Sequence, residues 1–307
     1  MQYKKNKPPT HSADHFGEAR AYWWNEDFLA LMAERLCLKN CRSAADIGCG
    51  TGDMTFRLAP YLHPHASVTG LDQEEDHLKI ARQRARHRKD DEQTTFSFVQ
   101  GSADALPFAD AQFDVTFCQT LLIHTEEPLL AIREMKRVTA PQGYVVALEP
   151  NNLVPHLMFD KYAETDYEVG NVLEMIEVRL RCERGKKKLG QGFNSLGDVL
   201  PDLFTQAGLS DVQVWQSDKA LSLIPPYDTR EKRVRAAQLV DWLENDEGGL
   251  GYDENLRYYR AGGGKKTAFD TYWHRVSRYK MSMLEMLKEQ KFISAGGQMM
   301  YLVAGRQ

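Results

Sequence analysis

The stretch that decides the fold is Ser43-Ala-Ala-Asp-Ile-Gly-Cys-Gly-Thr-Gly-Asp53. Ala44, Ala45 and Ile47 fit a buried strand. Three glycines then follow at alternate positions: Gly48, Gly50 and Gly52. Because glycine lacks a Cβ, such a loop permits both a sharp turn and close contact between backbone and ligand. The stretch therefore predicts a strand, a tight loop and a helix whose N-terminus holds a ligand.

The charges around this loop indicate the kind of ligand. Dinucleotide-binding loops have the spacing G-x-G-x-x-G and place a pyrophosphate on exposed backbone N–H groups. Here the spacing is G-x-G-x-G, with Asp46 before the glycines and Asp53 after them. Two carboxylates flanking the ligand position favour a cation over a polyanion. S-adenosylmethionine carries an ammonium and a sulfonium group and no phosphate.

At this point the residues resemble the class I S-adenosylmethionine-dependent methyltransferases, whose first motif is similar to the segment 46–52. The resemblance implies that Asp72, followed by Gln73, ends the second strand and binds the cofactor's ribose hydroxyls. A helix N-cap is the alternative role for Asp72. The resemblance also implies that Ala103 and Asp104 bind the adenine, although a turn-capping aspartate is an open alternative. Gln119 is expected to line the methionine end of the pocket.

Strands and helices alternate along the chain. Strands are predicted at 43–47, 67–72, 95–101, 113–120 and 143–150, with a sixth at 211–216 and a seventh at 299–305. Alternation through five units predicts a parallel sheet with helices on both faces. The resemblance adds that the last strand is antiparallel. The expected fold class is thus α/β, a Rossmann-like doubly wound seven-stranded sheet, mostly parallel, with helical insertions.

The segments outside the sheet complete the expected organisation. Helices are predicted at 17–38, 54–62, 74–88, 128–138, 195–207 and 267–288. The predicted divisions are an N-terminal tail and capping helix at 1–40, the cofactor-binding core at 41–150, a helical insertion at 151–194, a core continuation at 195–224, an insertion or lid at 225–297 and the final strand at 298–307. Tyr22 and Trp23 are aromatic residues at the entrance of the first helix, and we expect them to cover the cofactor.

Methyl transfer from a sulfonium is an in-line displacement that mainly requires alignment of the nucleophile and exclusion of water. A hydroxyl or protonated amine acceptor also needs a base, for which His124 and Glu149 are the candidates. The histidine could equally cap or pack against the next helix. No catalytic metal is expected, because the fourth strand ends in Cys118-Gln119-Thr120, where metal-dependent relatives carry an acid.

Composition limits the partners. A net charge of −4 over 307 residues argues against nucleic acid as the main partner. Five scattered cysteines indicate reduced thiols, and no apolar run reaches the length of a membrane span or signal peptide, so a cytoplasmic location is expected. The expected acceptor is a small molecule with an O, N or S nucleophile, and the aromatic insertions suit either a cover over it or a homodimer interface.

Two other functions stay open. The lysine runs Lys186–Lys188 and Lys265–Lys266 are interpreted as solvent-exposed loops. They could also contact phosphates, which keeps an RNA or nucleotide-linked acceptor as an alternative. A protein methyltransferase is the other alternative with a macromolecular acceptor. A regulator that binds S-adenosylmethionine without catalysis is the third reading.

Overall fold

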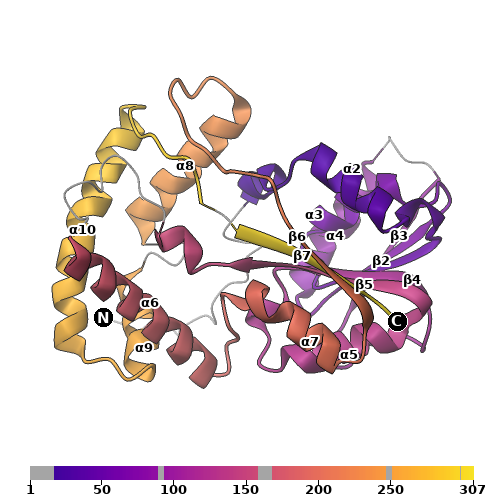
Figure 1. Ribbon diagram of the computed structural model, residues 1–307. Coiled ribbons are helices and arrows are strands. Elements are labelled where there is room, and N and C mark those ends of the chain that lie inside the picture. Colours follow the sequence, from indigo (N-terminus) through magenta and orange to yellow (C-terminus); the bar gives the residue numbers. More distant parts are fainter. Residues whose placement is uncertain (1–16, 89–92, 158–167, 247–250, 298) are drawn as a thin grey trace.

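The computed structural model describes residues 17–88, 93–157, 168–246, 251–297 and 299–307. Its centre is a seven-stranded sheet with the strand order β3-β2-β1-β4-β5-β7-β6. All neighbouring pairs from β3 to β5 are parallel, whereas β7 is antiparallel to both β5 and β6. The predicted fold class is therefore confirmed, and Figure 1 shows the sheet with helices on both faces.

The strands lie close to their predicted positions, because each is a local apolar run bounded by polar or turn residues. Their bounds are β1 Ser43–Ile47, β2 Ser67–Asp72, β3 Thr95–Gln100, β4 Phe113–Gln119, β5 Thr139–Asn151, β6 Ser210–Gln216 and β7 Met299–Arg306. The main difference is β5, which begins four residues before the predicted start at 143. Pro141 and Gln142, which precede the predicted start, belong to β5, where Gln142 has a φ of 67° and the register with β4 shifts.

Alternate residues of the central strands enter two separate cores. Val146 and Leu148 pack with α2 (Glu26–Arg35) and α3 (Asp53–Leu58) on one face. Val145 and Ala147 pack with α5 (Pro128–Val138) and α7 (Leu200–Gln206) on the other. The remaining core helix, α4 (Glu75–Arg86), contacts β2 and β3. Burial of both faces explains why β5 carries apolar residues at consecutive positions from 145 to 148.

Three predicted helices contain 3₁₀ segments in the structure. The helix expected at 54–62 divides into α3 and a 3₁₀ turn, η3 (Ala59–Tyr61). The segment expected to be one helix at 17–38 forms a 3₁₀ turn, η1 (Gly17–Tyr22), followed by α2. Trp23 and Trp24 lie between these two segments, and both are buried. The helix expected at 195–207 likewise begins as a 3₁₀ turn, η7 (Leu196–Val199), and Ser195 makes no side-chain cap.

The two insertions are helical, as predicted, and they pack on each other. The first contains α6 (Val169–Lys188), after a 3₁₀ turn, η5 (Val154–Leu157). The second contains α8 (Arg230–Asn245), α9 (Tyr252–Ala261) and α10 (Lys266–Lys288). One apolar cluster joins α6, α9 and α10, and a second joins α8 to the end of α10. We call these four helices the helical module; in Figure 1 it lies beside the sheet, beyond the end of β5.

The lysine run at 186–188 differs from its interpretation as a solvent-exposed loop. All three residues belong to the last turn of α6, and the Lys186 side chain is buried. Lys187 and Lys188 are exposed. Within the described residues, no helix is long and apolar enough to span a membrane.

Candidate active site

The glycine loop between β1 and α3 folds back onto the end of β2. The backbone N–H groups of Gly48 and Cys49 donate to the carbonyl oxygen of Leu71, at 2.7 and 2.9 Å. The three loop glycines have φ values of 72°, 53° and 85°, the left-handed region that glycine adopts without strain. The loop thus needs glycine for its backbone shape, in agreement with the predicted tight turn.

Asp72 fixes the loop from the end of β2. Its Oδ2 accepts a hydrogen bond from the Gly50 N–H at 2.8 Å, and its Oδ1 accepts one from the Glu74 N–H at 2.9 Å. The second bond corresponds to the cap-like alternative considered for this residue. His77 lies on the next helical turn, with Nδ1 3.7 Å from Oδ1 of Asp72. Each carboxylate oxygen keeps a lone pair for a further donor.

A cavity of about 200 Å³ opens at the carboxyl ends of β1, β2 and β4. Most of the predicted site residues form its wall. They are Gly48, Gly50, Asp72, Gln73, Ala103, Asp104, Gln119 and His124. Ligands of open α/β sheets bind at this edge, near the point where the strand order reverses. The sheet topology therefore brings together residues from four separate segments of the chain.

The other predicted site residues lie outside this wall. Trp23 is part of the core beneath α2, Tyr22 is half-buried, and Gly52 faces the ring of Phe56. Asp46 is buried beneath the loop, where its Oδ2 accepts a hydrogen bond from Thr55 Oγ1 at 2.5 Å. The lid role of the two aromatic residues stays a prediction.

This placement changes the basis of the charge argument. Burial raises the pKa of Asp46 to about 7, so this carboxyl does not present a fixed charge to a ligand. Asp53 is paired with Arg84 at 2.8 Å. The acidic side chains that do line the cavity are Asp72, Asp104 and Glu126. The preference for a cationic ligand therefore depends on these three residues.

Arg20 was not found by sequence reasoning, yet it lines the cavity from η1. Its Nη2 donates to Thr120 Oγ1 at 2.9 Å, and Thr120 has a φ of 50°, which is unusual for a β-branched residue. Burial lowers the Arg20 pKa, while nearby carboxylates oppose that shift. Among the described residues of the wall it is the only lysine or arginine. In the sequence, the only sign of this role was that Arg20 is a basic residue close to the aromatic residues Tyr22 and Trp23.

Gln119 presents an unsatisfied donor at the end of β4. Its side chain is 4% exposed, and its Nε2 has no hydrogen-bond partner. Leaving a buried amide unpaired costs about 1–3 kcal/mol, so such a group indicates a missing partner. Since Gln119 lines the cavity, a bound ligand with an acceptor atom would satisfy it.

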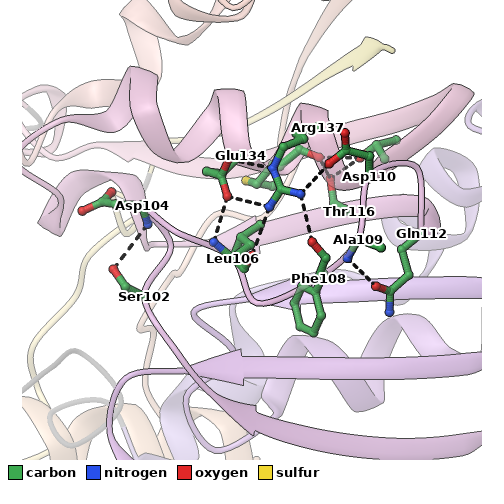
Figure 2. A network of polar contacts seen from close by, with 12 residues as sticks. Ser102, Asp104, Leu106, Phe108, Ala109, Asp110, Gln112, Thr116, Glu134 and Arg137 are labelled. Carbon is green, nitrogen blue, oxygen red and sulfur yellow. Dashed lines mark hydrogen bonds and ion pairs between the residues drawn. The ribbon is translucent and has the colours of Figure 1, made fainter.

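Ala103 and Asp104 belong to a loop that is fastened to α5 (Figure 2). The Ser102 hydroxyl accepts from the Asp104 N–H at 3.3 Å, so Ser102 supplies this turn contact. Glu134 Oε2 accepts from the Leu106 N–H at 2.9 Å, and Arg137 donates to the Leu106 carbonyl at 3.0 Å. These contacts hold the loop while the exposed Asp104 faces the cavity.

The two catalytic candidates differ in position. His124 is exposed in the 3₁₀ turn η4 (Leu122–His124) and lines the cavity. Glu149 is fully buried behind that turn, where its Oε1 accepts from the N–H groups of Leu121 and Leu122. Burial raises the pKa of Glu149 to about 8. The geometry therefore gives the histidine, and not the glutamate, a place in the wall.

The residues present fit S-adenosylmethionine. The loop supplies close backbone, Asp72 has free lone pairs for hydroxyl groups, and the orphaned Gln119 amide can donate to the ligand. Arg20 is the group in the wall that can pair with a carboxylate. Within the described residues, no group of three His, Cys, Asp or Glu side chains is placed to hold a metal ion.

The strand order, the antiparallel seventh strand and the site at the carboxyl edge together define a Rossmann-like methyltransferase. A family model described as a methyltransferase domain matches residues 39–198, which is more than half of the chain. The protein belongs to this family, within the class I S-adenosylmethionine-dependent methyltransferase superfamily.

The chain is similar to proteins of known name and to solved structures. A demethylmenaquinone methyltransferase of Lactococcus lactis is 38% identical over 110 residues, a match that spans 36% of this chain and 42% of the relative's length. A demethylmenaquinone methyltransferase of Geobacillus stearothermophilus is 32% identical over 207 residues, covering 62% of this chain and 79% of the relative. The solved structure of the YcgJ protein from Bacillus subtilis is 17% identical, with a TM-score of 0.49, and the match covers 92% and 99% of the two chains.

Proposed function

We propose that this protein transfers the methyl group of S-adenosylmethionine to a small molecule with an oxygen, nitrogen or sulfur nucleophile. The observation that carries the proposal is the convergence of the glycine loop, Asp72 and Gln119 on one cavity at the carboxyl edge of the sheet. Membership of the methyltransferase family supports it. A nucleotide with several phosphates would meet carboxylates at this place and little positive charge.

Each cofactor group has a proposed partner in the wall. Asp72 accepts from the ribose hydroxyls, and the loop at Ala103 and Asp104 binds the adenine. Arg20 pairs with the carboxylate of the methionine part, and Gln119 donates its free N–H to the same end. When bound, the cofactor supplies an electrophilic methyl group on a positively charged sulfur.

The chain's own residues then contribute alignment and exclusion of water. His124 faces the cavity from η4 and is the proposed general base where the acceptor is a hydroxyl or a protonated amine. Glu149 holds the backbone of that turn. A thiolate acceptor would need no base, so loss of His124 distinguishes these acceptor classes.

The acceptor is argued from the relatives. Demethylmenaquinone methyltransferases match this chain over as much as 79% of their length, and their names indicate a small-molecule acceptor. Demethylmenaquinone is therefore tested first, as the acceptor that would take the methyl group on a ring carbon in place of the oxygen, nitrogen or sulfur proposed above. The match leaves more than a third of this chain without a counterpart in that relative, so the helical module could select a different compound.

A stability and binding experiment on Gln119 tests the cofactor assignment. We expect Gln119→Leu to bind S-adenosylhomocysteine at least about tenfold more weakly by titration calorimetry, since one hydrogen bond to a charged group is lost. Because the variant also removes an unpaired buried amide, its unfolding midpoint in urea should be equal to or above that of the wild type. Gln206→Leu, on the far surface of α7, is the control for both measurements.

A loss of stability in Gln119→Leu with unchanged affinity would contradict the ligand role. The reaction itself is tested by release of S-adenosylhomocysteine in the presence of demethylmenaquinone, other small hydroxyl, amine and thiol compounds, RNA, and protein. Turnover only with RNA or protein would favour the alternative substrates. Tight S-adenosylhomocysteine binding without turnover in any pool would favour a regulator.

A further inference from the structure

The 3₁₀ turn η4 places His124 in the cavity wall, yet it is too short to hold itself. A single turn fixes few hydrogen bonds against the entropy of ordering its backbone. Within it, the N–H groups of His124 and Thr125 donate to the carbonyls of Leu121 and Leu122, at 2.9 and 3.2 Å. The first N–H groups of the turn and the Ile123 carbonyl need partners from elsewhere.

Glu149 satisfies the beginning of the turn. Its Oε1 accepts from the Leu121 N–H at 2.9 Å and from the Leu122 N–H at 2.7 Å. The residue is fully buried at the end of β5. An acceptor group at the start of a helical turn stabilises it, because the free N–H groups form its positive end.

Lys186 satisfies the other end, and it comes from the helical module. Its Nζ donates to the Ile123 carbonyl oxygen at 3.3 Å and also to Asn194 Oδ1. The side chain is 6% exposed, and burial lowers its pKa to about 8, although Glu183, Glu254 and Glu149 oppose the shift. The turn therefore has a hydrogen-bond acceptor, the Glu149 carboxyl group, at its N–H end. It has a hydrogen-bond donor, the Lys186 amine, at its carbonyl end.

The chain that follows α6 packs directly on the same turn. Gly192 has a φ of 85°, and a Cβ at this position would lie 2.2 Å from the Ile123 carbonyl oxygen. A Cβ on Gly190 would lie 3.2 Å from the carboxylate of Glu126. Glycine is therefore required at position 192, where the segment after α6 touches the backbone of η4.

We propose that Lys186 and Glu149 are positioning residues that hold η4 from its two ends and so fix His124 in the cavity wall. The proposal rests on the proposed function, because it assigns a purpose to the orientation of the proposed base. A buried amine is a costly way to stabilise a fold, since an apolar residue of similar size often does as well. The hydrogen bond from Lys186 to the Ile123 carbonyl oxygen explains why an amine is buried beneath the turn.

Hydrogen exchange measures the effect directly and needs neither cofactor nor acceptor. In Lys186→Met we expect the backbone amides of residues 121–125 to exchange about tenfold faster, the change produced by losing roughly one hydrogen bond to a charged group. The matched control is Lys187→Met, which alters the exposed neighbour on the same helical turn. Lys186→Arg keeps a cationic donor and should restore part of the protection.

A second readout follows the imidazole itself. The ring signals of His124 in ¹⁵N-histidine-labelled protein, assigned with His124→Gln, should shift in Lys186→Met, return toward the wild type in Lys186→Arg and stay unchanged in Lys187→Met.

Unchanged exchange and unchanged ring signals in Lys186→Met would overturn the proposal. If Lys186→Met loses protection throughout the sheet, Glu149→Leu decides. This variant removes the acceptor of the Leu121 and Leu122 N–H groups, so it must accelerate exchange at 121–125 while the sheet stays protected, and wild-type exchange there would overturn the proposal. Failure of methyl transfer in the wild type would contradict the proposed function without changing these results.

Discussion

Asp46 is a carboxyl group that the fold buries under its own ligand loop. The residue is 1% exposed, and the Thr55 hydroxyl donates to its Oδ2 at 2.5 Å. Burial raises its pKa from 3.8 to about 7, since one neutral hydrogen bond does not replace the water that a carboxylate loses. The folded protein consequently holds a proton on Asp46 that the unfolded chain releases near pH 4.

This difference predicts a pH-dependent stability with a definite sign. Between about pH 4 and 7 the native state binds more protons than the unfolded state at this residue, so Asp46 makes stability fall as the pH rises. Asp46→Asn keeps the acceptor for Thr55 and removes the titration. In urea unfolding at pH 4, the variant and the wild type should therefore have nearly the same free energy of unfolding. At pH 8 the variant should be more stable by up to about 4 kcal/mol.

Asp76→Asn is the control, because Asp76 lies exposed on α4, where it pairs with Lys79. A gap between Asp46→Asn and the wild type that is the same at pH 4 and pH 8 would contradict the buried titration. Ionisation of the wild-type residue on ligand binding is a separate process, so the measurement is made on the free protein.

Single residues also mark the limit of sequence reasoning. Glycines and strand-end acids were found because their roles depend on local backbone: Gly48, Gly50 and Asp72 all line the cavity. Arg20 was missed because its partner, Thr120, lies 100 positions away in the sequence. Lys186 was misinterpreted because its partner, Ile123, lies 63 positions away. Nothing in the local pattern of a lysine run separates a buried lysine from its exposed neighbours.

Among the elements, the crossing of α6 and α9 depends on glycine. A Cβ on Gly185 would lie 1.7 Å from the Tyr258 carbonyl oxygen, and one on Gly262 would lie 2.0 Å from the Arg181 carbonyl oxygen. The two helix backbones are therefore in direct contact at this crossing. In contrast, Gly170 at the start of α6 has open space around it.

The two glycines of α6 should respond to alanine in opposite directions. Gly185→Ala forces the helices apart and should destabilise the protein by about 1–3 kcal/mol, as overpacking does elsewhere. Gly170→Ala meets no neighbour and should be neutral or stabilising by up to about 1 kcal/mol, because alanine favours the helix. Denaturant unfolding gives both values. Equal effects of the two substitutions would mean that the close crossing is not formed in solution.

The strands and helices were predictable to different degrees for physical reasons. The predicted ends of β2 agree with the structure because polar Ser67 and Asp72 border a short segment that contains Val68 and Leu71. The helical spacing of apolar residues gave α10 to within one residue. The helix at 17–38 was wrong in detail: the chain leaves helical geometry at Trp23 and Trp24, which both enter the core, and periodicity alone does not locate such a break.

At the scale of the whole molecule, the two insertions form one module although thirty residues of the core separate them. Phe269 of α10 is fully buried at its centre, with Tyr259 of α9 at a ring distance of 5.2 Å and Val178 of α6 in the same cluster. Both insertions were predicted to be helical, and the second showed an amphipathic pattern at 267–288. The pattern did not identify its partner, because an apolar stripe specifies that a face is buried and not what covers it.

A module with its own core should be able to unfold separately from the sheet. Phe269→Ala removes its central ring and should cost about 3–5 kcal/mol, as for other buried phenylalanines. In native-state hydrogen exchange we expect α6, α9 and α10 to lose protection together, while β1 and β4 keep theirs. Because the cofactor groups come from the core, binding of S-adenosylhomocysteine should change by less than about twofold.

Met281→Ala, on the exposed side of α10, is the matched control. If β1 and β4 lose protection to the same extent as α6, the molecule unfolds as one cooperative unit and the helical module contributes to the stability of the cofactor site itself.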